Sequence, residues 1–191
     1  STYEPTAVHK VAEAGIARTF QNIRLFAEMT VLENVMVGRH IRTHCGAWAA
    51  MLRLPVQRRE EAEIRERAMA LLEYVGIARY AKFQSRTLSY GDQRRLEIAR
   101  ALATDPKLLA LDEPAAGMNA TEKVSLRGLL ERIRDDGRTI LLIEHDVKLV
   151  MGLCDRVTVL DYGKVIAQGL PDAVRSDKAV IEAYLGGASH G

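Results

Sequence analysis

The residues of this chain that could do chemistry gather in three short motifs. One is a serine–glycine turn, the next is a pair of adjacent acids, and the third contains a histidine. Each lies where a strand or a loop is expected to lead into a helix. Chance rarely produces this order and spacing, so we interpret the motifs together, as parts of one site for nucleotide phosphates. In chain order they are Leu88-Ser89-Tyr90-Gly91-Asp92-Gln93, Leu108-Leu109-Ala110-Leu111-Asp112-Glu113-Pro114 and Leu141-Leu142-Ile143-Glu144-His145-Asp146.

The adjacent acids Asp112 and Glu113 follow an apolar run that is typical of a buried strand. Ligands of open α/β sheets bind outside the carboxyl ends of the strands, so both side chains are expected at a ligand site. There Asp112 can hold Mg²⁺, directly or through water, while Glu113 polarises the water that attacks a γ-phosphate. The alternative is a solvated turn, because Asp and Pro both favour turns. The presence of the other motifs favours the catalytic interpretation.

Ser89 and Gly91 precede an expected helix and suit the binding of an anion. Serine is a good N-cap, and the backbone N–H groups at a helix N-terminus attract phosphate. The alternative for Ser89 is the cap alone. The apolar residues of this helix are expected to face inward, and its charged residues are expected to face solvent. The charged residues are Arg94, Arg95, Glu97 and Arg100.

Two further residues are weaker candidates. His145 follows a strand that is expected to lie beside the strand of Asp112, which favours a contact with the γ-phosphate, although a lone histidine is more often structural. Gln21 lies at the border between two regions of the chain, and a surface amide is its default interpretation.

The second half of the chain alternates short apolar strands with amphipathic helices, which is typical of an α/β fold with a parallel sheet covered by helices. A helix between the first two strands is expected to begin with a capping box of Asn119 and Glu122 and to end at Gly137. The expected strands are residues 107–111, 139–143 and 156–160. The other expected elements are a hairpin strand at 165–168, a short helix from Pro171 and a last helix at 180–185.

Residues 29–82 have a helical pattern without a strand signal. Thr30 and Glu33 form a capping box, and a long amphipathic helix is expected from Pro55 to Gly76. The simplest organisation is an all-helical subdomain, residues 29–82, inserted into a core made of residues 1–28 and 83–191.

Composition excludes several classes of protein. The net charge of +2 comes from 27 basic and 25 acidic residues that are well mixed, which argues against a nucleic-acid binder. Cys45 and Cys154 are far apart and are expected to be reduced thiols rather than a disulfide or a metal site. No run is apolar enough to span a membrane, and no signal peptide opens the sequence. We therefore expect a soluble intracellular protein.

The motifs resemble those of ABC-type ATPases. From about residue 14 to 185 the chain looks like the ATP-binding subunit of a bacterial branched-chain amino acid importer. The strings that carry the resemblance are Ala17-Arg18-Thr19-Phe20-Gln21-Asn22-Ile23-Arg24-Leu25-Phe26, Tyr90-Gly91-Asp92-Gln93-Arg94-Arg95-Leu96-Glu97-Ile98-Ala99-Arg100, Ala115-Ala116-Gly117-Met118-Asn119 and Leu142-Ile143-Glu144-His145-Asp146.

The resemblance implies a P-loop NTPase (RecA-like) fold, ATP and Mg²⁺ as cofactors, and a role for each motif. Glu113 would be the general base and Asp112 would support Mg²⁺. Gln21 would be the Q-loop glutamine, which contacts Mg²⁺ or the attacking water, and His145 would be the switch histidine. The signature, which contacts the γ-phosphate bound to a partner subunit, would be Ser89, Tyr90, Gly91, Asp92 and Gln93. A loop that crosses the dimer interface would be Ala115, Ala116, Gly117, Met118 and Asn119.

The resemblance also implies partners and a location. The partners would be permease subunits of the inner membrane, an identical or homologous ATPase subunit and, indirectly, a periplasmic binding protein, with no nucleic acid. The subunit would lie peripherally on the cytoplasmic face of that membrane. The helical subdomain would dock the permease, and Gln21 would link this contact to the nucleotide. The groove would be formed by Leu25, Phe26, Met29, Trp48, Met51 and Leu52.

Three features depart from the general ABC pattern. Tyr90 stands in place of a second glycine and Asp92 in place of a glutamine, as in the importer subfamily, and Ala120 replaces a proline. A G-x-x-x-x-G-K-[ST] motif, which cradles phosphates in P-loop enzymes, is absent from these 191 residues. We therefore expect an N-terminally incomplete core with exposed apolar faces and edges, and a fragment that is inactive alone. Alternatives are the ATPase of another system, such as urea transport or lipopolysaccharide export, and a non-catalytic module for dimerisation or permease docking.

Overall fold

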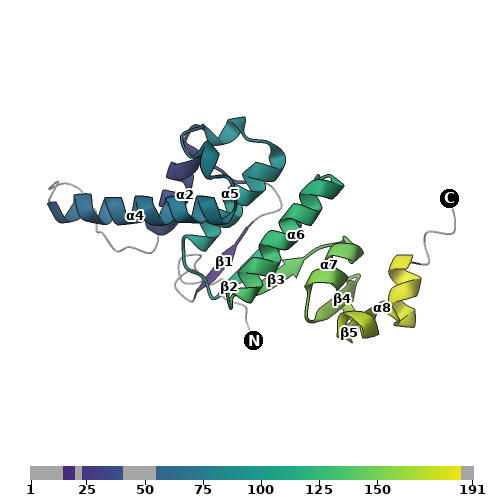
Figure 1. Ribbon diagram of the computed structural model, residues 1–191. Coiled ribbons are helices and arrows are strands. Elements are labelled where there is room, and N and C mark those ends of the chain that lie inside the picture. The colour runs from purple at the N-terminus through teal and green to yellow at the C-terminus, as the bar shows by residue number, and fades with distance from the viewer. Residues whose placement is uncertain (1–14, 20–22, 41–54, 186–191) are drawn as a thin grey trace. The chain divides into compact units, whose positions relative to one another are not determined.

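A parallel sheet of three strands forms the centre of the larger of two compact units in this computed structural model (Figure 1). The strands are β1 (Ile16–Arg18), β2 (Leu108–Asp112) and β3 (Thr139–Ile143), in the order β1-β2-β3. The structure describes residues 15–19, 23–40 and 55–185. The units are Ser1–Ile143 and Glu144–Gly191, and each is described by itself.

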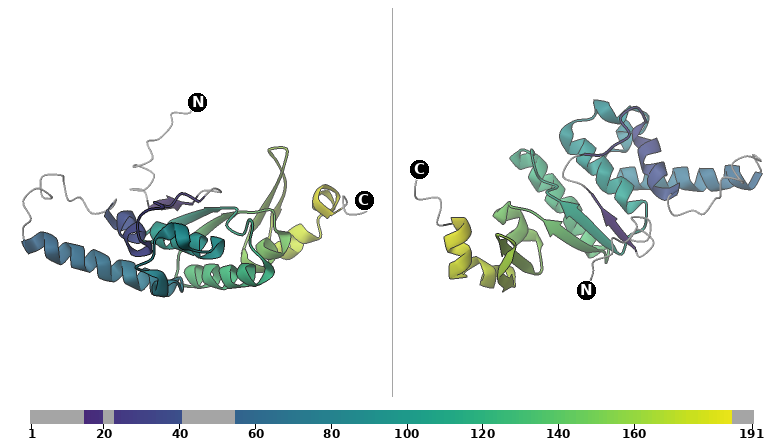
Figure 2. Two further views of the ribbon diagram at one scale, coloured as in Figure 1. Left: turned by 90° about the horizontal axis from the view of Figure 1, so that it is seen from above. Right: turned by 180° about the vertical axis from the view of Figure 1, so that it is seen from behind.

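Helices cover one face of the sheet in the first unit (Figure 2). Leu109 and Leu111 of β2 are fully buried on that face, together with apolar side chains of α5 and α6. On β3, Leu141 and Ile143 point the other way and are about half exposed. The expectation that these strands are buried on both faces is therefore wrong for β3, because the described helices of this unit pack on only one side. The helices are α2 (Val31–His40), α4 (Pro55–Tyr74), α5 (Tyr90–Leu102) and α6 (Ala120–Asp135), with short 3₁₀ turns at Ala78–Tyr80 and Ser85–Thr87.

The expected helix caps are confirmed. Glu33 accepts the Thr30 backbone N–H at 2.8 Å, and the Thr30 hydroxyl accepts the Glu33 N–H at 3.2 Å. Asn119 and Glu122 form the same reciprocal pair at the start of α6. These hydrogen bonds satisfy backbone donors that a helix leaves without an internal partner. The helices therefore begin where the local sequence specifies.

α2 and α4, which we call the helical layer, pack on each other and on α5. The face of α4 that was expected to be apolar is buried at Ile64, Ala68, Leu72 and Val75. An all-helical region between β1 and β2 is confirmed in its described residues, and the boundaries 1–28, 29–82 and 83–191 stay a prediction.

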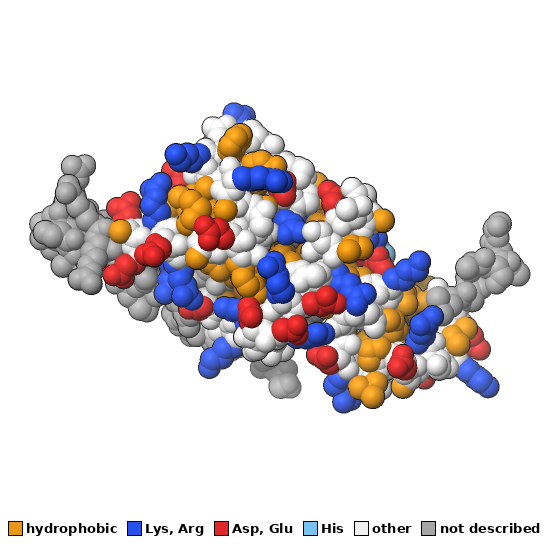
Figure 3. Space-filling view, viewed as in Figure 1, with side chains coloured by type: hydrophobic (Ala, Val, Ile, Leu, Met, Phe, Trp, Pro, Cys, Tyr) orange, Lys and Arg blue, Asp and Glu red, His pale blue; other side chains and the backbone are white. Residues whose placement is uncertain are grey.

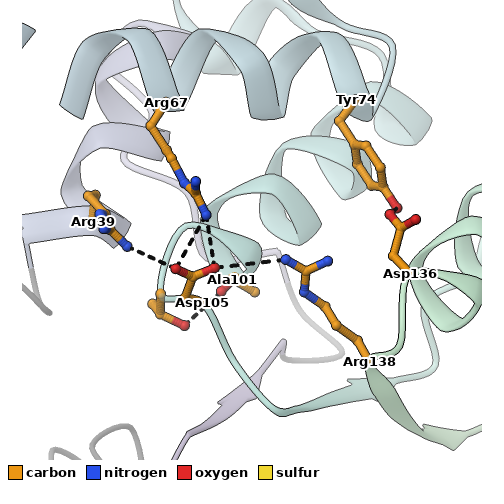
Figure 4. Close-up of polar contacts among 8 residues, drawn as sticks. Arg39, Arg67, Tyr74, Ala101, Asp105, Asp136 and Arg138 are labelled. Carbon is orange, nitrogen blue, oxygen red and sulfur yellow. Dashed lines mark hydrogen bonds and ion pairs between the residues drawn. The ribbon is translucent and has the colours of Figure 1, made fainter. Parts of the chain in front are cut away.

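Asp105, in the turn after α5, connects the helical layer to the sheet (Figure 4). Its carboxylate lies 3.1 Å from Arg67 of α4, 3.4 Å from Arg39 of α2 and 3.8 Å from Arg138, which precedes β3. Asp105 has a φ of +51°, a conformation that Asp tolerates better than most residues. One carboxylate therefore holds three elements that are far apart in sequence.

The second unit is a hairpin packed against short helices. β4 (Val157–Asp161) and β5 (Lys164–Gly169) pair antiparallel, as the turn at Gly163 predicts. The run at 156–160 thus belongs to a two-stranded antiparallel sheet rather than to the parallel one. The helices are α7 (Val147–Leu153), α8 (Pro171–Arg175) and α9 (Lys178–Val180), followed by a π-helical turn at Ile181–Leu185, and Val157, Val174 and Val180 form the core.

Basic and acidic side chains are interspersed over the described residues of the face drawn in Figure 3, in keeping with the small net charge. Within the described ranges, no helix combines the length and the apolar character that crossing a membrane requires.

Candidate functional site

The carboxyl end of β2 carries the adjacent acids. Asp112 is the last residue of β2 and is paired with Ile143 of β3. Glu113 continues this pairing, because its backbone N–H donates to the Ile143 carbonyl at 2.9 Å. Its φ is +44°, which is uncommon for a residue with a side chain and is often found at functional positions. Both carboxylates are half-buried at the strand end, as the sequence predicted.

Arg18 at the end of β1 is a part of this site that the sequence analysis missed. Its Nη2 donates to Asp112 Oδ2 at 3.0 Å, in an ion pair that is partly open to solvent. An ionised carboxylate has about four acceptor positions on its two oxygens, so this contact orients Asp112 and leaves it able to bind another group. The parallel pairing of β1 with β2 brings the two side chains to one edge. A strand of three residues has too short a pattern to be predicted.

Asp112 fits the way proteins hold Mg²⁺ with a nucleotide. Magnesium usually keeps several waters and takes one or two carboxylates in addition to substrate phosphates. The described residues contain no group of three or more His, Cys, Asp or Glu that could hold a metal by itself. The donor set at the β2 end is therefore consistent with an ion held largely by phosphates and water, with one carboxylate ligand.

Ser89 is the N-cap of α5. Its hydroxyl accepts the Asp92 N–H at 3.2 Å and donates to Asp92 Oδ2 at 2.9 Å. Gln93 Nε2 donates to the Leu88 carbonyl at 3.0 Å, which holds the turn before the helix. The capping role is thus present, and it occupies the N–H groups of Asp92 and Gln93. A phosphate contact by Ser89 stays a prediction.

The structure brings the signature residues 89–93 together with residues 115–119, which we call the interface loop. A pocket of about 390 Å³ lies between the starts of α5 and α6. Gly91 fits closely there: a Cβ on this residue would lie 3.0 Å from Glu122 Oε1. A side chain at position 91 would therefore have to displace the Glu122 carboxylate, which accepts the Asn119 N–H at the start of α6. The pocket is lined by Gly76, Arg79, Ser89, Gly91, Asp92, Arg95, Met118, Thr121, Glu122, Ser125 and Leu126.

The interface loop is anchored at both ends. Ala115 and Met118 are buried, and the Met118 N–H donates to the Ala115 carbonyl at 3.2 Å. Gly117 has a φ of +73° and is exposed, and Asn119 is the N-cap of α6. The loop is thus a fixed turn with its middle presented to solvent.

The expectation that Arg94 and Glu97 face solvent is wrong. Arg94 is 1% exposed and Glu97 is 3% exposed. They form an ion pair with a nitrogen–oxygen distance of 2.8 Å, and Glu97 also accepts the Arg24 backbone N–H at 2.8 Å. Burial of a charge requires such partners. Helical periodicity alone places charges outward, and only the i, i+3 spacing of opposite charges gave a signal for this pair.

Two predicted site residues do not belong to the part of the site described above. Gln21 lies outside the described residues, as do Trp48, Met51, Leu52 and Cys45. His145 belongs to the second unit, where its backbone N–H donates to Glu144 Oε2 at 3.1 Å and its ring is exposed. The roles of Gln21 and His145 stay predictions.

Comparison with known proteins decides the family. Residues 3–116 match the family model described as "ABC transporter". The chain belongs to the ABC transporter family. Within this ABC ATP-binding protein, residues 164–190 match a second family model, "Branched-chain amino acid ATP-binding cassette transporter".

The relatives of this ABC protein agree with the resemblance of its motifs. It is 47% identical to the high-affinity branched-chain amino acid transport ATP-binding protein LivG of Escherichia coli over 180 residues, which are 94% of this chain and 71% of LivG. It is 32% identical to the lipopolysaccharide export system ATP-binding protein LptB of the same organism, over 94% of this chain and 68% of LptB. The ADP conformation of the ATP-binding cassette MJ1267 superimposes with a TM-score of 0.76 at 31% identity, covering 93% of this chain and 71% of that one. The predicted fold class and family are confirmed.

Proposed function

We propose that this chain is the ATP-hydrolysing subunit of an importer for branched-chain amino acids. The match of residues 164–190 to the branched-chain amino acid cassette model carries the assignment, because this segment lies outside the general ABC match at residues 3–116. The higher identity to LivG than to LptB, 47% against 32%, supports the same choice.

In this proposal the β2 end performs the hydrolysis. Glu113 accepts a proton from the water that attacks the γ-phosphate, and the bond from its N–H to the Ile143 carbonyl holds its backbone in place. Asp112, oriented by Arg18, holds Mg²⁺. When bound, Mg²⁺ neutralises charge on the phosphates. By the resemblance, Gln21 would be the Q-loop glutamine and His145 the switch histidine of this ATPase.

The α5 N-terminus acts on the nucleotide of a second subunit. The N–H groups that follow Ser89 and the hydroxyl of Ser89 contact the γ-phosphate there, and the exposed interface loop crosses between the two subunits. For the hydroxyl to donate to phosphate it must leave Asp92 Oδ2, to which it donates at 2.9 Å. Closure of an identical or homologous pair of subunits would therefore be coupled to the loss of this local hydrogen bond.

Exposed apolar side chains around the start of α2 support docking to permease subunits at the cytoplasmic face of the membrane. Phe26 is 48% exposed, Met29 39% and Phe83 54%. The backbone beneath them is rigid: the carbonyl of Phe26 accepts hydrogen bonds from the buried side chains of Asn34 and Ser85 at 3.1 and 2.8 Å. Apolar groups held outward in this way suit a helix of a membrane partner. Gln21, five residues before Phe26, would couple permease docking to the nucleotide site.

The proposal is tested with a chimera in which this chain replaces its 180 aligned residues in E. coli LivG. The chimera is reconstituted in vesicles with the membrane subunits of that transporter. We expect uptake of branched-chain amino acids and ATP hydrolysis that uptake stimulates. Hydrolysis without uptake would reject the importer assignment, and the lipopolysaccharide export alternative would then be tested with an LptB chimera. If the LivG chimera shows neither uptake nor ATP hydrolysis, the result would favour a non-catalytic docking module.

A further inference from the structure

A continuous set of contacts through α5 joins the interface loop to the segment that follows Gln21. We propose that Tyr90, Arg94 and Glu97 are positioning residues that couple permease docking near Phe26 to the interface loop. The inference deepens the proposed function and rests on it. Tyr90 is also a residue of the signature, but in this role all three residues act through the next contact rather than on the reacting atoms.

The first link is Glu97, which is nearly fully buried on α5. Its Oε1 accepts the Arg24 backbone N–H at 2.8 Å and its Oε2 accepts Arg94 Nη1 at 2.8 Å. Each carboxylate oxygen therefore has its own partner. Because water is excluded there, loss of either hydrogen bond would cost much free energy. Arg24 lies two residues before the exposed Phe26, so a displacement of the docking segment acts directly on the Glu97 carboxylate.

The second link runs from Arg94 to Tyr90, one helical turn earlier. Arg94 Nη2 donates to the Tyr90 hydroxyl at 3.2 Å, and the guanidinium carbon lies 5.7 Å from the centre of the tyrosine ring. This distance allows a cation–π attraction in addition to the hydrogen bond. A guanidinium is planar and rigid, so a shift at its Glu97 side is transmitted to its tyrosine side.

The third link is the ring of Tyr90 against the interface loop. A Cβ placed on Gly117 would lie 3.5 Å from Tyr90 Cε1 and 3.7 Å from Cζ, so the ring lies beside Gly117, where an added side chain would touch it. Glycine, the residue that the general ABC signature has in place of Tyr90, has no ring to make this contact. The relay therefore depends on a residue type by which this chain departs from the general signature.

The proposed coupling gives a reason for the buried charges of Arg94 and Glu97 on α5. Apolar residues at these two positions would serve packing alone. A buried ion pair gives little stability beyond a hydrophobic pair of the same size, so its retention favours a role in geometry. Spatial continuity alone does not establish coupling, and a double-mutant cycle is the direct test.

The first experiment measures hydrogen exchange at single amides of the 191-residue chain by NMR. Tyr90→Phe removes only the hydroxyl that Arg94 contacts, and we expect exchange of the Arg24 N–H to accelerate about threefold or more. Tyr162→Phe, at a fully exposed tyrosine of the second unit, is the matched control and should leave Arg24 unchanged. Equal Arg24 exchange in Tyr90→Phe and the parent would overturn the relay.

The cycle is completed with Glu97→Gln, read at the Met118 N–H of the interface loop. Introduced into the parent, Glu97→Gln should accelerate exchange of the Met118 N–H. Introduced into Tyr90→Phe, it should cause no further acceleration. Independent, multiplicative effects would overturn the coupling. If Glu97→Gln does not fold, as circular dichroism would show, the Tyr90→Phe measurement at Arg24 decides the question by itself.

The functional arm uses the LivG chimera in vesicles. Tyr90→Phe should lower the ratio of transport-stimulated to basal ATP hydrolysis about threefold or more, because the phenol hydroxyl is the group that Arg94 contacts. An unchanged ratio would overturn the role in coupling. A chimera that hydrolyses no ATP would instead reject the proposed function. The exchange experiments would then still test the contacts of Tyr90, Arg94 and Glu97.

Discussion

Glu113 stands at a strand end in a left-handed conformation, and its backbone N–H donates to the Ile143 carbonyl. We predict that Glu113→Gln lowers ATP turnover of the LivG chimera by about 10²-fold or more and traps ATP in a closed dimer, because the amide keeps the shape but cannot accept the proton. Steady-state hydrolysis and nucleotide retention measure this, and near-normal turnover would remove Glu113 from the base role.

Tyr74 at the end of α4 is a residue whose environment predicts a pH dependence. Burial, and then the hydrogen bond that its hydroxyl donates to Asp136 at 2.6 Å, raise the pKa of Tyr74 to about 12 from 10.0. The folded state thus favours the neutral phenol. Its contribution to stability is fully present below pH 10, and it is lost as the pH rises through about 12.

We therefore predict that the free energy of unfolding falls across this alkaline range, measured by urea denaturation at a series of pH values. Tyr74→Phe has no ionisable hydroxyl, so its free energy of unfolding should lack the decrease that comes from titration of Tyr74. Identical pH profiles for the parent and Tyr74→Phe would show that the hydrogen bond with Asp136 does not control the titration.

At the scale of elements, Asp105 holds α2 and α4 to the strand side of the first unit through Arg39, Arg67 and Arg138 (Figure 4). Asp105→Asn keeps the side-chain shape and tolerates the positive φ, but it leaves three guanidinium groups close together without the carboxylate. Since the cluster is partly exposed, we predict a loss of about 1 kcal/mol in unfolding free energy, measured with urea.

The matched control is Asp135→Asn, at an exposed aspartate whose carboxylate pairs with the neighbouring Arg134. It should change stability by less than about 0.5 kcal/mol. If Asp105→Asn and Asp135→Asn have equal free energies of unfolding, the ion pairs of Asp105 do not stabilise the packing of the helical layer.

At the scale of the whole molecule, the 191 residues contain the residues proposed as a general base, a magnesium ligand and a signature, but no G-x-x-x-x-G-K-[ST] sequence. The signature is proposed to complete the site of a partner, so it cannot replace a phosphate cradle within one chain. We predict that these 191 residues by themselves bind Mg-ATP with a Kd well above the micromolar range, and isothermal titration calorimetry measures this. Micromolar binding would show that the described residues cradle the phosphates in another way.

The sequence by itself determined those features that depend on neighbours along the chain. The cap at Ser89, the capping box of Asn119 and Glu122, and the hairpin turn at Gly163 were all predictable, because each needs only residues within one turn. The motif strings also determined the family, since they combine several residue types at fixed spacing. The fold class follows from that family.

Only the tertiary structure decided what depends on residues far apart in the chain. The helical pattern placed Arg94 and Glu97 in solvent, yet packing buries them, because the Arg24 backbone arrives from 73 positions away to share the charge. Arg18 joined Asp112 across 94 positions, through a strand too short to have a pattern. Burial is set by which surfaces meet, and no local period carries that information.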